Sequence, residues 1–232
     1  MRNAGSKPRP ARAAWLIVFY SAFRILPVAF LPGCVAAGAI AYKVVGPPAV
    51  EARHVLAKEP TLVMVENYRQ PSGSATDAEV LGRHVVVELM KHDLAPTVDV
   101  NTLYDLRQRD PKAFRTMSID AVGRKLGAGQ IVYIDLTQCA IEGTLGGDMV
   151  KGVMSARVRV VDVETGKTLW PEEGGDGFPL SAGIPFTPVG QGTDESSIRQ
   201  RLCASMADQI GKLFRKWKPD DLDDHSKGSE GV

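Results

Sequence analysis

The chain has 232 residues, of which 44% are hydrophobic and 24% are charged, and its formal net charge is +1. This length suits one ordinary domain with extensions, and the composition excludes a disordered chain and a multi-pass membrane protein. The charge is unevenly distributed, because residues 1–34 hold five basic side chains and no acidic one. The remainder has 23 basic and 27 acidic side chains. Since phosphate binding needs clustered Lys and Arg, we expect no nucleic-acid partner.

The amino terminus has the order of a secretory leader. Residues 1–12 are polar and basic, and the apolar stretch that follows them to Tyr42 is interrupted only by Arg24. The quartet Leu31-Pro32-Gly33-Cys34 resembles the lipobox of bacterial lipoproteins, although the −2 position normally holds a small or β-branched residue and not proline. We therefore expect a signal peptide over 1–33, a lipid on Cys34, and a mature protein held on the membrane and facing the periplasm.

Two alternatives remain for this segment. Ile25–Tyr42 is 18 uncharged residues, which is close to the spanning length, so an uncleaved signal anchor in the inner membrane is the first alternative. The second is a soluble protein whose first helix only resembles a leader.

The rest of the chain divides by composition. Residues 34–59 contain a Gly-Pro-Pro step and little periodicity, which is typical of a tether. Residues 60–218 form the expected folded domain. Residues 219–232 hold five acidic side chains against one lysine, so we expect a disordered acidic tail.

The first half of the domain alternates between strand and helix patterns. Residues 61–65 form a continuous apolar run, typical of a strand that is covered on both faces. A helix is expected from Thr76 or Asp77 to about His92, then a short strand over 96–100 and a helix from Asn101. Ser118 is expected to cap a further helix.

The second half begins with strands that alternate clearly. Over residues 131–141, Tyr133, Asp135, Thr137 and Cys139 are expected to share one face, and residues 150–163 form a second long strand with Arg157 and Arg159 on one face. A Thr-Gly turn at residues 164–167 predicts a hairpin into a third strand.

Residues 174–192 are rich in glycine and proline, and we expect a long loop there that is either functional or disordered. The final helix is expected to bury a stripe of six side chains: Ile198, Leu202, Met206, Ile210, Leu213 and Trp217.

This order of elements predicts an α/β (α+β) fold, with a single mixed β-sheet and helices packed mainly on one face. The polar side chains on the other face, Asp135, Arg157 and Arg159 among them, are either simply solvated or part of a surface that binds a partner. Phe178, Ile184 and Phe186 in the expected loop either anchor the same partner or tuck under the loop.

No set of residues indicates catalysis or metal binding. The four histidines are spread over tether, helix and tail, and the Gly-Ala-Gly step at residues 127–129 follows a helix, which is the reverse of a phosphate-binding loop. We expect no enzymatic activity, no metal and no cofactor. With Cys34 lipidated, Cys139 and Cys203 are left either as a disulfide or as two free thiols.

Residues 60–217 resemble a superfamily of bacterial envelope lipoproteins. Its members include the curli-secretion lipoprotein, the lipoprotein activators of penicillin-binding proteins and the amino-terminal domain of the Tol-Pal β-propeller protein. The resemblance rests on the strand Leu62–Asn67, the helix-Gly-Ala-strand step Val122–Ile134, the strand and turn Val160–Lys167, and the amphipathic final helix. The chain departs from the family at residues 142–148, which are too few for the membrane-spanning hairpin of a secretion pore.

The resemblance implies a lipid-anchored envelope domain that binds or organises other envelope proteins. We therefore expect a non-enzymatic protein with an envelope protein as partner and a membrane attachment through the lipid. The alternatives are a self-assembling, homo-oligomeric component of an envelope secretion complex, and an envelope domain that binds or converts a small ligand.

Overall fold

The computed structural model describes residues 48–68, 75–144, 146–173, 175–190 and 194–219. Val50–Trp217 form one compact unit. The first 49 and last 15 residues belong to a second unit that lies almost wholly outside the described residues. The leader, Cys34 and the acidic tail from Asp220 onwards are therefore outside the description. Within the described ranges, no helix is both long and apolar enough to span a bilayer.

A single mixed sheet organises the compact unit, which confirms the predicted fold class. The strand order is β1-β2-β3-β4, with β5 also pairing with β3. β1 lies parallel to β2, and the other pairs are antiparallel. The strand bounds are Thr61–Glu66 (β1), Gln130–Gly143 (β2), Met149–Asp162 (β3), Thr168–Trp170 (β4) and Phe178–Pro188 (β5).

Strand β5 corrects the expectation of a long loop over residues 174–192. Eleven of those residues form β5, nine of them pair with β3, and the side chains of Ala182 and Ile184 point into the core. The sequence hides this strand because three of its residues are prolines, at positions 179, 185 and 188. Proline has no backbone N–H to donate to a neighbouring strand, so it is unsuited to a central strand but is tolerated on an edge strand.

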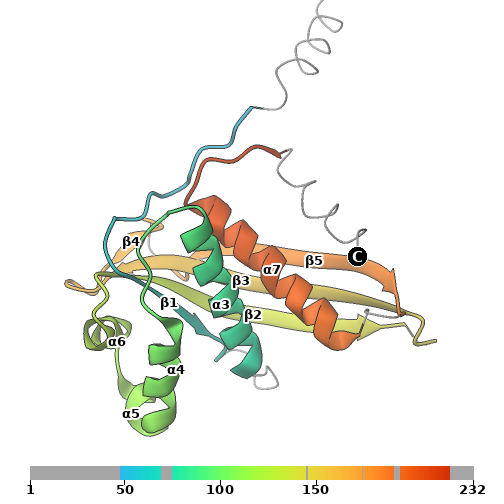
Figure 1. Cartoon of the computed structure of the whole chain (residues 1–232), viewed down its shortest axis with the longest axis horizontal. Helices are drawn as coiled ribbons and strands as arrows, with labels where there is room; N and C mark the ends of the chain where they lie inside the picture. Colours follow the sequence, from blue (N-terminus) through green and yellow to red (C-terminus); the bar gives the residue numbers. More distant parts are fainter. Residues whose placement is uncertain (1–47, 69–74, 145, 174, 191–193, 220–232) are drawn as a thin grey trace, which may run out of the picture. The chain divides into compact units, whose positions relative to one another are not determined.

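The two long helices cover one face of the sheet (Figure 1). They are α3 (Ala75–Lys91) and α7 (Glu195–Leu213). Their buried stripes follow the predicted spacing, and the core packs α3 and α7 against Val63, Ile134 and Met154 of the sheet. Trp217 departs from the prediction, because α7 ends at Leu213 and Trp217 instead pairs with Val50.

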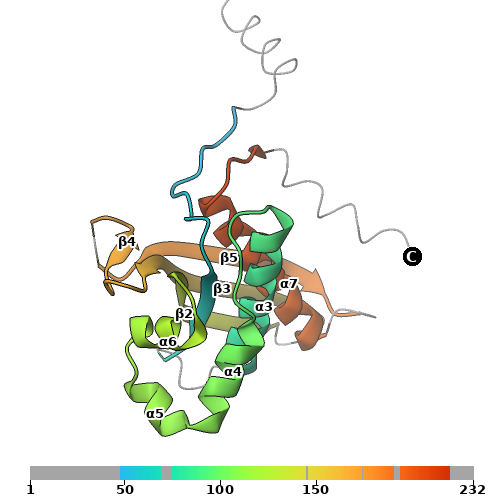
Figure 2. The same ribbon diagram turned by 60° about the vertical axis from the view of Figure 1, so that its left-hand side comes forward.

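Three short helices pack on the opposite face at the β1 side of the sheet (Figure 2). They are α4 (Val100–Arg109), α5 (Pro111–Thr116) and α6 (Ile119–Leu126). Leu103, Phe114 and Val122 from these helices bury Leu62 and Ile131 of the sheet. The strand expected over 96–100 reduces to one bridge, between Thr61 and Thr97, because the Asp99 carboxylate caps α4 and Val100 is already helical.

Residues 50–59, which we expected to belong to the tether, run along the compact unit as a strap. Val50 and Trp217 exchange backbone hydrogen bonds of 2.7 and 3.0 Å, and Leu56 is buried in the core. The buried side chain of Gln130 donates to the carbonyl of Ala57 at 2.7 Å. The folded unit therefore begins about ten residues before Pro60.

Candidate functional site

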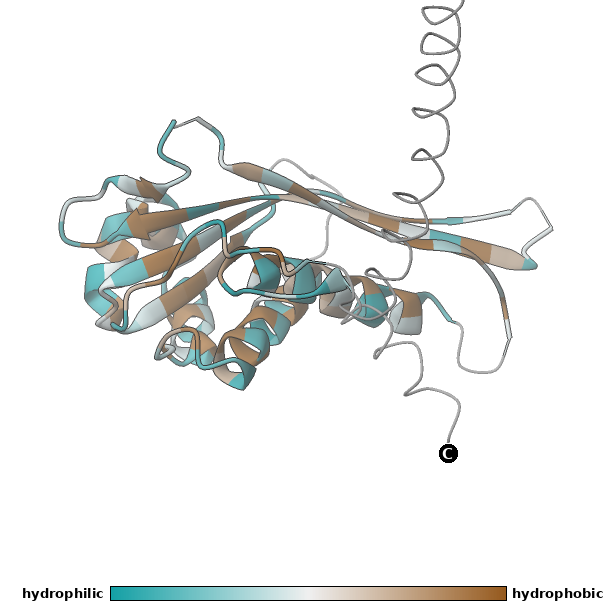
Figure 3. Cartoon of the chain, turned by 90° about the horizontal axis from the view of Figure 1, so that it is seen from above, coloured by the Kyte–Doolittle hydropathy of each residue, from teal (hydrophilic) through white to brown (hydrophobic). Residues whose placement is uncertain are grey.

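The sheet face opposite α3 and α7 carries the most concentrated polar chemistry of the compact unit. Along β2 and β3 polar and apolar side chains alternate, visible as alternating teal and brown in Figure 3. The apolar set lies under α3 and α7. The register places Tyr133 opposite Arg159 and Asp135 opposite Arg157. Three residues that the sequence analysis selected, Asp135, Arg157 and Arg159, thus lie together; we call them, with Tyr133 and Glu66, the open-face cluster.

Glu66 was not foreseen as part of this cluster. It faces Asp135 across the β1–β2 pair, and only 3% of its surface is exposed. Arg107 of α4 reaches it with an Nη2–Oε1 distance of 2.6 Å, and the same guanidinium lies 5.0 Å from the centre of the Phe114 ring. The sequence shows Glu66 only as the end of an apolar strand, and its cation is 41 positions away, so no local pattern joins them.

Burial is the main cause of the pKa shifts of Glu66, Tyr68 and Tyr133 on this face. Burial raises the pKa of Glu66, and the Arg107 cation opposes that shift. Tyr68 hydrogen-bonds Glu66, and burial together with that carboxylate raises the pKa of Tyr68 to about 12. Burial also raises the pKa of Tyr133. Both phenols therefore stay neutral at physiological pH and act as hydrogen-bonding and stacking groups, not as bases.

The two arginines of β3 are held loosely by comparison. Arg159 lies over the Tyr133 ring, 4.5 Å from its centre. Arg157 is 3.4 Å from the Asp176 carboxylate, and the two side chains are 39% and 58% exposed. Such exposed pairs contribute little and exchange readily with solvent or another ligand.

The three apolar residues expected in the loop fall in different places. Ile184 is buried in the core under α7, and Phe178 packs 5.3 Å from Trp170, with Arg53 over its ring. Ile184 is thus buried and Phe178 half-buried, and both belong to β5 and not to a loop. Phe186 is half exposed, with the Lys151 ammonium 5.3 Å from its ring centre.

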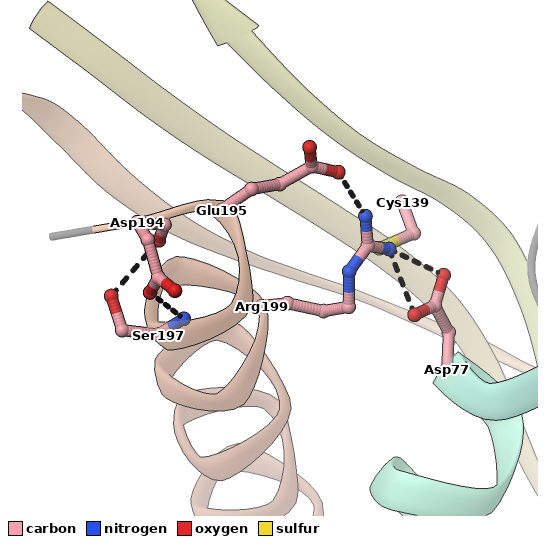
Figure 4. Close-up of polar contacts among 6 residues, drawn as sticks. All are labelled: Asp77, Cys139, Asp194, Glu195, Ser197 and Arg199. Carbon is pink, nitrogen blue, oxygen red and sulfur yellow. Dashed lines mark hydrogen bonds and ion pairs between the residues drawn. The ribbon is translucent and has the colours of Figure 1, made fainter.

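A second polar cluster joins the starts of α3 and α7 (Figure 4). Nη1 of Arg199 lies 2.8 Å from both carboxylate oxygens of Asp77, which is 1% exposed, and 4.0 Å from Sγ of Cys139. Nη2 of Arg199 also binds Glu195. This arrangement fastens two helices to β2 and leaves no group free to react.

Cys139 and Cys203 are both free thiols. Burial, followed by the Asp77 carboxylate, raises the pKa of Cys139 to about 11, and burial raises that of Cys203 to about 12. Because the thiolate is the reactive form, neither sulfur is activated as a nucleophile.

Ligand and metal sites have little support in the described ranges. No group of three or more His, Cys, Asp or Glu side chains there is placed to hold a metal. A surface hollow of about 270 Å³ between α4 and α6 is lined by six residues: Thr102, Asp105, Leu106, Arg109, Lys125 and Leu126.

Comparison with known proteins yields distant structural likeness only. No protein-family model and no curated protein matches the chain. Lipoprotein GNA1162 from Neisseria meningitidis is 15% identical, with a TM-score of 0.42, and the match covers 65% of this chain and 96% of that one. The PelC dodecamer from Paraburkholderia phytofirmans is 13% identical, with a TM-score of 0.37 and coverage of 73% and 95%.

Hypothetical protein CT253 from Chlamydia trachomatis is 15% identical, with a TM-score of 0.38 and coverage of 68% and 98%. The solved structures that resemble this chain thus include a bacterial lipoprotein, but likeness at this level says nothing about activity or partners.

Proposed function

We propose that this chain is a non-enzymatic, lipid-anchored protein of the cell envelope whose compact unit docks another envelope protein through the open face of its sheet. One observation carries the proposal. Two long helices cover one face of the sheet, whereas on the other face three short helices pack at the β1 side and leave Arg157 and Arg159 of β3 partly exposed.

The side chains on this face suit recognition of a protein. Tyrosine and arginine are enriched at the energetic centres of protein interfaces, because they combine large contact areas with directional donors. The cluster supplies Tyr133, Arg157 and Arg159 on adjacent strands of a rigid sheet. Next to them, the small residues Ser155, Ser181 and Gly183 leave the sheet surface flat enough for close approach.

Attachment to the membrane is proposed from the leader and the lipobox-like quartet. Fifteen residues separate Cys34 from Val50, where the compact unit begins. Such a segment reaches at most roughly 55 Å when fully extended, so a lipid on Cys34 keeps the docking face within reach of other envelope proteins. Intact mass spectrometry of protein extracted from membranes tests this step, and residues 1–33 still attached would exclude it.

Site-specific photocrosslinking in native membranes tests the docking function. A benzoylphenylalanine at Ser181 lies on the open face, and the matched probe at Val87 lies exposed on α3. We expect one discrete adduct from position 181, which disappears when Arg157→Glu is added, and none from position 87. Equal labelling from both positions, or an adduct that ignores Arg157→Glu, contradicts docking through this face.

A further inference from the structure

Arg157 and Arg159 lie next to each other on the open face. They alternate along β3 with Val158, which is buried, so both guanidinium groups leave the same side of the strand. Residues two apart on a strand are separated by roughly 7 Å. The two arginines therefore place two guanidinium groups at a fixed spacing on one face of the sheet.

Two arginines elsewhere in the compact unit already bind buried carboxylates. Arg107 binds Glu66 at 2.6 Å, and Arg199 binds Asp77 at 2.8 Å. No ion pair joins Arg159 to a carboxylate of the described residues, and its buried Nε atom, like that of Arg107, has no hydrogen-bond partner among them. Arg157 has only the long, exposed contact with Asp176.

Arg159 is also oriented in advance. Its guanidinium stacks over Tyr133, directly opposite on β2, and that ring is itself half-buried against the apolar side chains under α4, α5 and α6. A stacked guanidinium loses less conformational freedom when it binds, and its planar donors match a carboxylate in a two-point hydrogen bond. Besides its contact with Tyr133, the Arg159 guanidinium therefore keeps donors that no carboxylate of the described residues occupies.

We infer that Arg157 and Arg159 form a subsite for an acidic segment of the docked protein, with two carboxylates on alternate residues of an extended chain. The inference rests on the proposed docking function and specifies the chemistry of the partner. The spacing of the two arginines along β3 equals that of alternate side chains on an extended peptide. A carboxylate matches the planar donors of a guanidinium in a two-point hydrogen bond, so one carboxylate for each arginine completes the pair.

Titration with two peptides tests this inference on the full chain in detergent micelles, labelled with ¹⁵N-arginine. The probe is acetyl-Glu-Ala-Glu-amide, and its matched control is acetyl-Gln-Ala-Gln-amide. We expect the glutamate peptide to shift the Nε–Hε signals of Arg157 and Arg159, and to leave Arg109, an exposed arginine of α4, unchanged. Arg159→Gln should weaken binding about tenfold, the value of one charge-assisted hydrogen bond. Arg109→Gln should not weaken it.

Two further readouts keep the outcome clear. The unchanged signals of Arg107 and Arg199 report that Arg159→Gln still folds, and Tyr133→Leu, which removes only the stacked ring, should weaken binding by a smaller factor. Equal shifts with both peptides, equal shifts at Arg109, or unaltered binding by Arg159→Gln would overturn the subsite.

The two proposals fail in different ways. If position 181 crosslinks a partner and Arg159→Gln does not change that adduct, the acidic subsite is contradicted and the docking function stands. If the glutamate peptide binds selectively but position 181 gives no crosslink in membranes, the docking function is contradicted and the subsite stands.

Discussion

Arg199 is the residue on which the junction of α3, α7 and β2 depends. Its guanidinium binds Asp77 on α3, and the Asp77 carboxylate adds to the effect of burial in raising the pKa of the Cys139 thiol. We expect Asp77→Asn to lower the free energy of unfolding by about 2 kcal/mol, because the Arg199 cation loses its buried counter-charge. The loss stays moderate because part of the Arg199 side chain remains in contact with solvent.

The same substitution should change the chemistry of Cys139. With Asp77 neutral, the Arg199 cation remains beside the sulfur, so the pKa of Cys139 should fall below its value of about 11. The pH dependence of iodoacetamide alkylation measures this. Glu195→Gln is the matched control, since Glu195 is exposed and has the smallest effect on the thiol. An alkylation profile unchanged by Asp77→Asn contradicts this assignment.

His54 holds the strap through its ring. The imidazole stacks on Trp170, with centroids 6.1 Å apart, and meets Phe214 edge-on at 6.4 Å. Burial lowers its pKa, and the Glu172 charge opposes this shift in part. A histidine with a lowered folded pKa binds fewer protons folded than unfolded, so stability falls as the pH drops through about 6.5.

His54→Phe keeps the ring contacts and removes the titration. We expect the free energy of unfolding in urea to decline less between pH 7.5 and pH 5.5 in this variant than in the natural chain. The slope that remains belongs in part to His92, whose pKa burial also lowers. A pH dependence identical to that of the natural chain would exclude His54 as a contributor.

At the scale of elements, the close contact between α7 and β3 depends on Gly152. A methyl group at this position would lie 2.6 Å from Leu202 Cδ1 and 3.0 Å from Ile198 Cγ2. Gly152→Ala should therefore push α7 from the sheet and cost about 1–3 kcal/mol of stability, as overpacking does.

Gly183→Ala is the matched control, because Gly183 lies on the adjacent strand and its nearest neighbour would be 3.7 Å from the new methyl group. We expect a change within about 0.5 kcal/mol there. Urea unfolding of both variants measures the difference, and equal effects would show that α7 does not restrict the size of residue 152.

Periodicity predicted the elements whose pattern runs without interruption. The stripes of α3 and α7 and the strands around residues 131–136 and 150–162 lie where the spacing places them. The prediction that Cys139 shares a face with Asp135 is wrong, because a β-bulge lies at Thr137. The extra residue reverses the alternation, so Cys139 packs toward α7 and not beside Asp135.

The candidate site divides in the same way. Asp135, Arg157 and Arg159 could be predicted as one face because they belong to long alternating strands. Glu66 and Arg107 could not, because their contact joins the end of β1 to α4 across 41 positions. The ion pair between Glu66 and Arg107 depends on the burial of Glu66, and that burial results from the packing of α4 and α5 against the β1 side of the sheet.

At the scale of the whole molecule, the sheet edge formed by β5 is where a second copy of the chain could add a strand. Within the described residues β5 pairs with β3 on one side, and no strand pairs with its other side. Open edges invite pairing with another chain, and natural proteins often protect them with proline. Pro179, Pro185 and Pro188 remove three of the N–H donors that such pairing requires.

Replacing two of these prolines should therefore expose the edge. We expect the double variant Pro179→Thr, Pro185→Thr to show a weight-average mass that rises with concentration in light scattering after size exclusion, because it gains two N–H donors and two residues that favour strands. Ser181→Thr on the same strand is the matched control, since it adds strand preference without adding a donor. If the double variant associates no more than Ser181→Thr does, proline is not what protects this edge, and the charges around the open face must keep the copies apart instead.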